Sequence, residues 1–299
     1  MAVSSVRDVV ACFDAGQFRM AQPVRKAMAI SWTNGYWADT TMFAGQPGPQ
    51  YYASAPLVFA PMARSTHGGW DHGPNVAPLK KHLKRIDMTY LGFSASGFIT
   101  DVLGYVPFVD ESAVGEEQVV DNSQVKAPRH GTGTGVRLYL VSVAPSSLVA
   151  GNTVTVTYTN SDGVAGRSTG PVVIQNTQVA NGALLNAGQA SHQGPFLPLQ
   201  SGDAGVREIE SIRVDGPGDV GLFTVVMARV LCNLPCYPGV AGADTAVRCA
   251  AETDFLRTVA VLPLIEDDAY LSCLMQHFNT SSASTSLAAL YFNFDVIWG

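Results

Sequence analysis

Charged residues are scarce in this sequence. Asp, Glu, Lys and Arg make up 14% of its 299 residues, well below the roughly 25% of ordinary soluble domains. The net charge is −6, so the chain has no excess of positive charge with which to bind nucleic acid. A surface with so few charges favours coverage by neighbouring protein molecules.

Long apolar runs and a regular cysteine pattern are also missing. The longest apolar stretch, Val220–Cys232, contains Arg229 and is shorter than the ~20 residues that a membrane-spanning helix needs. The first residues include Arg7 and Asp8 and no apolar run with a cleavage site, so neither a signal peptide nor a membrane partner is predicted. The five cysteines are odd in number and scattered, which favours reduced thiols and synthesis in a cytoplasm.

Regular alternation predicts β-structure in the middle of the chain. Thr alternates with Val or Tyr from Thr153 to Thr159, the two-residue period of a half-buried strand. Asn160–Gly163 then predicts a turn with an antiparallel return. Similar runs predict further strands over 136–143, 172–174, 207–214, 220–231, 258–264, 270–275 and 286–298, with 207–214 and 220–231 forming a second hairpin. The sequence therefore predicts an all-β, jelly-roll-like β-sandwich, whose turns the 29 Gly and 17 Pro would supply.

The first ninety residues lack this alternation. Ser5, followed by Asp8 and by apolar Val6, Val9 and Val10, predicts a short helix that Gly16 ends. The residues after it are irregular and rich in aromatic side chains, which favours an arm that wraps over its own sandwich or onto a neighbour, with an ordinary core-covering loop as the alternative. We divide the chain accordingly into an N-terminal helix and extended arm (1–90) and a β-sandwich domain (91–299).

Seven aromatic residues of the arm are the candidate interface residues: Trp32, Tyr36, Trp37, Phe43, Tyr51, Tyr52 and Trp70. Because the arm has no periodic core of its own, we expect their burial to need a partner surface. Each large side chain that is buried contributes ~1.5–3 kcal/mol, so several together would favour association. The sequence predicts a homo-oligomer, a trimer or a dimer.

Two further segments are assigned to helical structure. Lys80, Lys81, Lys84 and Arg85 form the basic part of a predicted exposed helical turn, which is expected to be solvated, with an acidic partner as the alternative. The segment Phe93–Phe108 has apolar residues at helical spacing and a closing Pro107. These apolar residues are Phe98, Ile99, Val102, Leu103 and Val106.

Candidate metal ligands are few. His67, Asp71 and His72 offer two imidazoles and a carboxylate, which bind zinc or iron only where a further ligand converges on them, and a Gly-rich loop is the commoner role of such a stretch. The cysteines at 232, 236, 249 and 273 fit no usual zinc spacing, and we expect them to pack as buried side chains. No metal or cofactor is assigned.

No catalytic constellation is visible either. Gly131–Gly135 (GTGTG) precedes a strand, whereas a phosphate loop follows one. Gly92–Ser96 lacks the last glycine of a nucleophile elbow. The adjacent acids at 116–117 and 267–268 are expected to point apart or into solvent. With no nucleophile, base and orienting group together, no catalytic residue is assigned and an enzyme is not expected.

Several segments between Leu91 and Gly299 resemble virion structural proteins of tailed bacteriophages. They are Tyr105–Asp110 (YVPFVD), Glu116–Asn122 (EEQVVDN), Thr157–Arg167 (TYTNSDGVAGR), Gly205–Val214 (GVREIESIRV) and the closing Val296–Gly299. The resemblance implies a head-decoration or cement protein, a β-sandwich that assembles as an oligomer on the major capsid protein shell. It implies a place on the capsid surface of the virion after synthesis in the cytoplasm of the host bacterium. A tail, collar or host-binding spike component is the alternative, followed by a metal-dependent sandwich enzyme.

Overall fold

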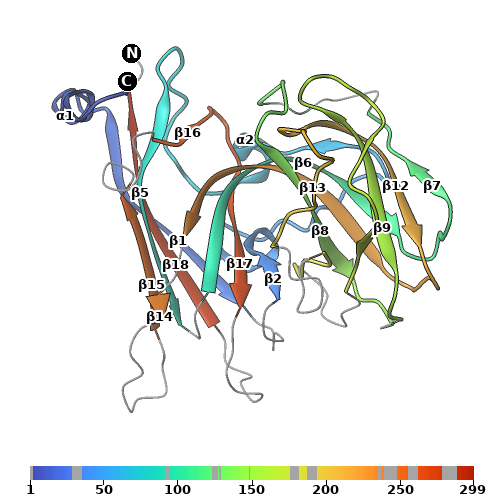
Figure 1. The fold of residues 1–299 in the computed structure, drawn as a ribbon. Helices are drawn as coiled ribbons and strands as arrows, with labels where there is room; N and C mark the ends of the chain where they lie inside the picture. Colours follow the sequence, from blue (N-terminus) through green and yellow to red (C-terminus); the bar gives the residue numbers. More distant parts are fainter. Residues whose placement is uncertain are drawn as a thin grey trace.

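The structure is a computed structural model of the chain. It describes residues 3–28, 36–91, 95–122, 127, 129–147, 149–175, 182–186, 194–234, 237–238, 248–254, 262–277 and 288–299. Almost all of the regular structure is β-strand, arranged in three sheets (Figure 1). The predicted all-β class is confirmed.

The first sheet joins the two ends of the chain, in the order β14-β15-β5-β18-β1-β3 with β16 beside β5. Its strands are β1 (Phe18–Met28), β3 (Ala44–Gln46), β5 (Lys81–Leu91), β14 (Tyr237–Pro238), β15 (Arg248–Asp254), β16 (Leu264–Ile265) and β18 (Ala288–Trp298). β18 pairs antiparallel with β1 on one side and with β5 on the other. The extended arm expected over residues 1–90 is therefore wrong, because much of it forms strands of this sheet. The boundary expected after residue 90 falls inside β5.

The basic residues at 80–85 also differ from the prediction. Lys81 and Arg85 belong to β5 and not to a helical turn, and the side chain of Lys81 is buried. β5 is held between β15 and β18, so its backbone has pairing partners on both sides. Tertiary pairing outweighs the local charge pattern here.

The second sheet has the order β2-β17-β6-β13-β8, with β4 beside β6. Its strands are β2 (Trp37–Asp39), β4 (Ala60–Pro61), β6 (Ala95–Asp110), β8 (Val136–Ala144), β13 (Leu222–Leu234) and β17 (Leu271–His277). β6 covers the segment for which we predicted a helix, and that prediction is wrong. The pairing of β6 with β13 shifts register three times, and Phe108, beside one of these bulges, has φ 56°. Bulges interrupt the alternation of a strand and leave apolar residues at spacings that imitate a helix.

The third sheet has the order β10-β9-β12-β7, with β11 beside β9. Its strands are β7 (Glu117–Val119), β9 (Thr153–Asn160), β10 (Arg167–Ser168), β11 (Val172–Val173) and β12 (Val206–Asp215). β9 alternates strictly between half-buried and buried residues, and β10 returns antiparallel to it, as predicted. The second predicted hairpin is wrong: β12 pairs with β9 and β7, whereas β13 pairs with β6 and β8. The turn at Gly216–Asp219 crosses between sheets.

Helical structure is confined to α1 (Val6–Asp14), α2 (Arg64–His67) and the 3-10 turn η1 (Thr40–Met42) within the described residues. The predicted N-terminal helix is confirmed, with Ser5 and Asp8 forming a reciprocal capping box. Its buried residues are Val9 and Cys12, whereas Val6 and Val10, expected on the same face, are exposed. Across the part of the chain that the structure describes, no helix has the length and apolarity to cross a membrane.

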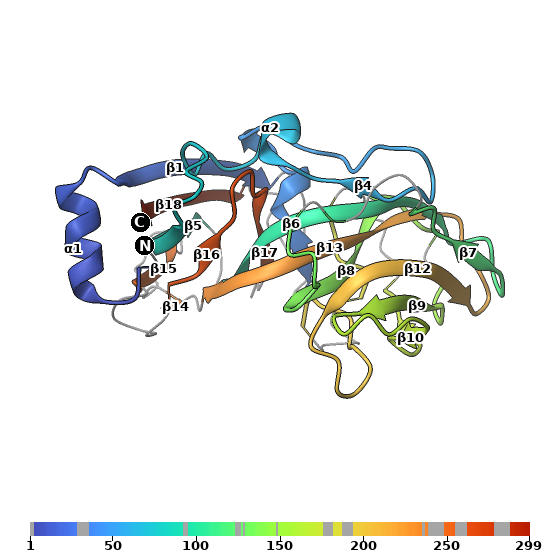
Figure 2. The same ribbon diagram turned by 90° about the horizontal axis from the view of Figure 1, so that it is seen from above.

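The second sheet is shared by two sandwiches. At one end it packs against the first sheet, where Ile99, Leu234 and Phe292 are buried together, and we call this the first sandwich. At the other end it packs against the third sheet, where Val106, Phe223 and other apolar residues form a separate core, and we call this the second sandwich. β6 and β13 run through both (Figure 2). The prediction of sandwich packing is confirmed, but the described residues form three buried clusters in place of one core: one in each sandwich, and a third that contains Tyr139 and Leu274.

The glycine-rich turn before β8 depends on a close approach of two backbones. Gly133 has φ 76°, which favours glycine, and its neighbour Thr134 forms an isolated bridge with Gly205. A Cβ atom at Gly205 would overlap the carbonyl oxygen of Gly133 and lie 2.8 Å from the amide nitrogen of Gly135. The turn is thus pressed against the start of β12, and only glycine fits there.

We expect Gly205→Ala to lower the free energy of unfolding by about 1–3 kcal/mol, the usual cost of forcing an extra carbon into a packed site. Gly131→Ala is the matched control, because the space around Gly131 is open and its φ lies outside the left-handed region. Urea unfolding of both variants measures the difference. Equal stability of the two variants would show that the backbone relaxes without cost.

Candidate functional site

Four of the seven candidate interface aromatics are buried inside the chain itself, namely Trp37, Phe43, Tyr52 and Trp70. The ring of Trp70 lies 4.8 Å from that of Phe292 in β18, and the hydroxyl of Tyr52 donates to the buried Asp39. Tyr36 is partly buried against the first core and Tyr51 is exposed, while Trp32 lies outside the described residues. The expectation that these side chains need a partner is wrong for the four buried ones, because short strands and loops fold them onto the sheets.

The three candidate metal ligands each have other partners. Asp71 accepts hydrogen bonds from Arg19 and Arg64. His72 is fully buried and both of its ring nitrogens are engaged, and Nδ1 of His67 lies beside the hydroxyl of Thr66. Among the described residues, no group of three or more His, Cys, Asp or Glu side chains is placed to hold a metal ion.

The other candidate motifs have structural surroundings. Cys12 and Cys273 are buried free thiols and Cys232 is a partly buried one, whereas Cys236 lies outside the described residues. Asp267 and Asp268 point to different partners, as expected for adjacent acids: Asp267 accepts from the amides of residues 76 and 77, and Asp268 accepts from Ser65.

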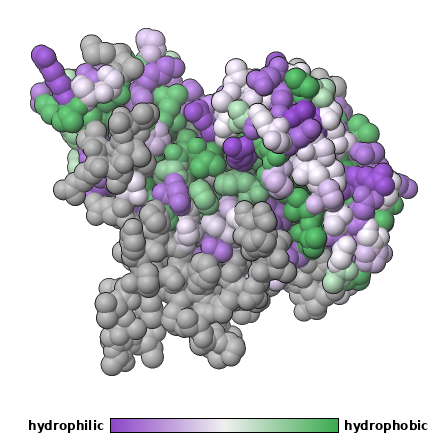
Figure 3. Space-filling model, viewed as in Figure 1, coloured by the Kyte–Doolittle hydropathy of each residue, from purple (hydrophilic) through white to green (hydrophobic). Residues whose placement is uncertain are grey.

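A polar cavity of about 370 Å³ lies where the two sandwiches meet. It is lined by Ala77–Lys81, by Arg129 and His130, and by Ile265–Asp267. The first stretch leads into β5 of the first sheet, and Arg129 and His130 precede the glycine-rich turn of the second sandwich. Figure 3 shows a recess between the two lobes, where hydrophobic and hydrophilic surfaces adjoin. We take this cavity and the charged groups behind it as the candidate site.

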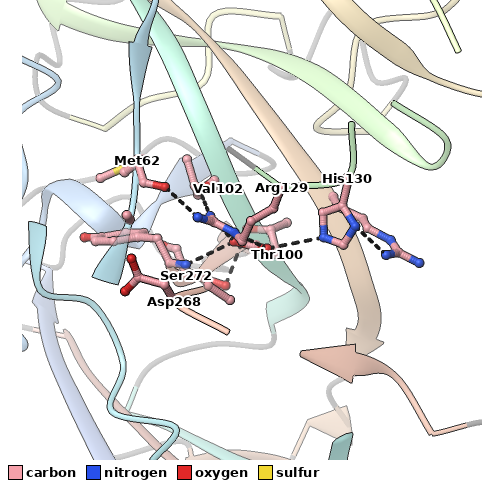
Figure 4. Close-up of polar contacts among 12 residues, drawn as sticks. Met62, Thr100, Val102, Arg129, His130, Asp268 and Ser272 are labelled. Carbon is pink, nitrogen blue, oxygen red and sulfur yellow. Dashed lines mark hydrogen bonds and ion pairs between the residues drawn. The ribbon is translucent and has the colours of Figure 1, made fainter. Parts of the chain in front are cut away.

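A buried ion pair forms the back of the site. Asp101 of β6 is buried, and its carboxylate accepts from Nε and Nη2 of Arg129, at 3.1 and 2.7 Å. Arg129 also donates to the carbonyl oxygens of Met62 and Val102 (Figure 4). The amide of Tyr270 supplies a further donor to Asp101. Such a pair is stable in a low-dielectric interior only when its remaining donors and acceptors are satisfied, which is the case for this carboxylate.

His130 connects this pair to β13. Its Nδ1 lies 2.7 Å from Nη1 of Arg229, and its Nε2 lies 3.4 Å from Asp101. Asp101 and Arg229 face each other across β6 and β13 in register. The polar cluster therefore lies where both long strands pass from one core to the other. His130 adopts φ 53°, an uncommon conformation for a residue other than glycine.

A second imidazole–cation contact lies across the cavity. Nζ of Lys81, buried at the start of β5, is 3.1 Å from Nδ1 of His72 and 3.4 Å from the carboxylate of Asp267. Nε2 of His72 lies 2.9 Å from the carbonyl oxygen of Ala269, to which it donates. Burial, together with the charge of Lys81, lowers the pKa of His72 to about 4. The imidazole therefore stays neutral at neutral pH and ties the first sheet to the segment that leads into β17.

Sequence analysis missed this cluster. Asp101 and Arg229 are charged residues inside otherwise apolar strands, and that contrast was the one signal of a buried pair. Arg129 and His130 stand alone between a polar stretch and the glycine-rich turn, so nothing local connects them to Asp101. The charges of the cluster are largely paired with one another, which suits a structural junction better than proton transfer or nucleophilic attack.

Glu111 is a buried acid at the far end of the second sandwich, directly after β6. Its Oε2 has no hydrogen-bond partner among the described residues. Burial, and then the charges of Asp219 and Asp110, raise the pKa of Glu111 to about 7. Asp219 is buried as well and accepts from the amides of Ser147 and Val149. Glu111 is thus held in its neutral form in mildly acidic solution.

We expect the stability that His72 contributes to be lost as the pH falls from 6.5 towards 4. Its folded pKa lies below its unfolded pKa, so the unfolded chain takes up the proton first. The shift corresponds to about 3 kcal/mol of unfolding free energy between these pH values. His72→Gln removes that part of the pH dependence in chemical unfolding, whereas His67→Gln, the control at the last residue of α2, keeps it. An unchanged pH profile in His72→Gln would contradict this assignment.

Glu111 predicts the opposite trend. Because its folded pKa is raised, the stability linked to its proton is present below pH 4.5 and is lost as the pH rises through 7. At pH 8 we expect Glu111→Gln to be more stable than the wild type by about 2–3 kcal/mol, and at pH 4 to be equal to it. Glu116→Gln, at an exposed acid nearby, should change neither value. A gain at pH 4 as large as at pH 8 would rule out titration of Glu111 as the cause.

Comparison with known proteins adds little to this description. No family model matches the chain, and no curated protein matches it significantly. Among solved structures, the Gt strain of infectious bursal disease virus is similar at 8% identity, with a TM-score of 0.20 over 94% of this chain and 80% of that one. The VP2 subviral particle of infectious bursal disease virus is similar at 8% identity, with a TM-score of 0.18 over the same shares. Likeness at this level leaves the function to the features of the chain itself.

Proposed function

We propose that this chain is a structural virion protein of a tailed phage, a cement or decoration protein that binds the shell of the major capsid protein. The observation that carries the proposal is where the phage-like segments lie. Tyr105–Asp110 ends β6, Glu116–Asn122 contains β7, Thr157–Arg167 spans β9 to β10, and Gly205–Val214 forms most of β12. These segments are distant in sequence and meet in the second sandwich. The fifth segment, Val296–Gly299, lies apart from them at the end of β18 in the first sheet, so four of the five phage-like segments belong to one folded unit.

An exposed apolar surface at the other end of the molecule supports an assembly role. Val6 and Val10, one helical turn apart on α1, are 66% and 53% exposed, and Phe18 and Met20 of β1 are 37% and 52% exposed. The rings of Phe13 and Phe18 are 4.8 Å apart and connect the two elements. We call Val6, Val10, Phe18 and Met20 the N-terminal apolar stripe. Gathered apolar side chains at the surface are typical of protein contacts.

The proposed mechanism is mechanical. The second sandwich supplies a rigid body, and the N-terminal apolar stripe supplies contact with the capsid protein or with a second copy in a dimer or trimer. Each contact can be modest, because a shell repeats it many times and all must break together. This surface replaces the buried aromatics as the expected site of association. The proposal includes no catalytic step, cofactor, nucleic acid or membrane, and it places the mature protein on the capsid surface after synthesis in the host cytoplasm.

On purified particles that carry this chain, we expect its copy number to approach that of the major capsid protein. The double variant Val6→Ser/Val10→Ser should bind the shell about tenfold more weakly or worse, because two apolar side chains lose their burial. Val9, Cys12 and the Ser5 cap are unchanged in it, so its melting temperature should match that of the wild type. Quantitative gels of particles and a binding titration with empty shells measure both quantities.

Val164→Ser/Val173→Ser is the matched control, because these valines are each 51% exposed and belong to the second sandwich. It should bind shells as the wild type does. Equal binding by both double variants would remove the stripe from the contact. A copy number of only tens per particle would favour a tail, collar or spike component over a cement protein.

A further inference from the structure

An exposed turn covers the buried carboxyl group of Glu111. The turn runs over residues 216–221, between the end of β12 and the start of β13, and Gly216 and Pro217 in it are exposed. A Cβ atom at Gly221 would lie 2.8 Å from Oε1 of Glu111 and 3.0 Å from its Cδ. The carboxyl group is therefore packed directly against the backbone of the turn, which separates it from the solvent.

The turn is held more firmly on one side than on the other. On the side of residues 147–152, the amide of Gly218 donates a hydrogen bond of 3.0 Å, and the carboxylate of Asp219 accepts two amide hydrogen bonds of 2.9 Å. On the other side, the amide of Glu111 donates to the carbonyl oxygen of Gly221 at 3.2 Å, and its own carbonyl oxygen accepts from the amide of Asp219 at 3.4 Å. Both of these bonds are long, so the contact with Glu111 is where the turn separates most easily.

The charges that act on Glu111 are negative. Asp219 faces it from the turn and Asp110 precedes it in β6, and burial, followed by these two charges, raises the pKa of Glu111 to about 7. The neighbouring strands carry Glu117 on β7 and, on β12, Asp215, which is paired with Arg213. The carboxyl group therefore lies in a negative part of the second sandwich.

Loss of the proton from Glu111 favours its separation from the turn. Its Oε2 is buried and has no hydrogen-bond partner among the described residues, and an unpaired charge in such a place is costly. When the turn lifts, water reaches the carboxylate and Asp219 moves away from it, so burial and repulsion both become less costly. While the carboxyl group carries its proton it is neutral, and the repulsion is absent.

We propose that residues 216–221 form a pH-sensitive lid over Glu111, which stays closed while the carboxyl group carries its proton and opens far more readily once the proton is lost. The opening is local, because β12 and β13 on either side of the lid are held in their ladders by β9 and β6. The lid is independent of the proposed virion role, because it rests only on groups at this end of the second sandwich.

Carbon-13 NMR of the side-chain carboxyl groups measures the proton on Glu111 directly. In the wild-type chain we expect the carboxyl resonance of Glu111, assigned through its backbone, to titrate with a midpoint above about pH 6, because a buried acid beside other acids holds its proton. A midpoint near pH 4.5, the ordinary pKa of a glutamate, would overturn the proposal.

Hydrogen–deuterium exchange at pH 5 and pH 8, corrected for the intrinsic pH dependence of exchange, measures the opening. In the open lid the pKa of Glu111 returns from about 7 towards 4.5, so the opening equilibrium shifts by about 50- to 100-fold between these pH values. The protection of the amides of Glu111 and Asp219 should fall by that factor at pH 8. The amides of Ser147 and Val149, on the firmly held side, should keep their protection, and that of Val156 in β9 reports global unfolding.

Two variants separate the lid from other effects of pH. Glu111→Gln keeps the size of the side chain and cannot titrate, so the amides of residues 111 and 219 should exchange equally at both pH values. Glu116→Gln, at an exposed acid nearby, should behave as the wild type. The proposal is also overturned if the wild-type amides show no pH difference beyond that of β9, or if the full difference persists in Glu111→Gln. If Glu111→Gln does not fold, the carbon-13 titration of the wild type still decides.

Discussion

The whole fold depends on two strands that each serve two hydrophobic cores. β6 and β13 contribute Ile99 and Leu234 to the first sandwich, and Val106 and Phe223 to the second. Because the same backbones span both, neither core can be lost without disturbing the ladder of the other. Between the cores the strands carry Asp101 and its cross-strand neighbour. The charged cluster thus lies between the two cores, beside a third buried cluster that includes Val102 and Ala228, and satisfied partners there stabilise the junction.

Local sequence patterns correctly predicted the elements whose residue pattern matches their surroundings in the fold. β9 faces one core with one side only, so its Thr and Val residues alternate as its burial does. The N-terminal helix is marked by Ser5 and Asp8, which act within a single turn. The closing run at 286–298 is apolar enough to predict a buried strand, and β18, which covers 288–298, lies between two others. In each case the information needed lies within a few residues.

The remaining features depend on contacts between distant segments. β6 is buried on both faces and interrupted by bulges, so Val102 and Leu103 are adjacent yet belong to different clusters. Lys81 looked like a solvated charge because its partners at 72 and 267 are far away in sequence. The cavity and its charged cluster draw on five separate stretches, and no local rule joins them. The irregular sequence of the first ninety residues led us to expect exposed aromatic side chains. That inference was wrong, because loops as well as strands bury aromatic side chains in this protein.

The pairing of β1 with β18 also sets an order of assembly for the chain itself. The third sheet and the strands β6, β8 and β13 fall between residues 95 and 234, whereas the first sheet needs segments from both sides of that range. During synthesis on a ribosome, these strands are all made before β18, the strand that lies between β1 and β5 in the first sheet. Folding proceeds by units, and pairing between distant segments is slow. We therefore expect the second sandwich to form first, so that the ends of β6 and β13 that project from it provide the surface on which the first sheet closes.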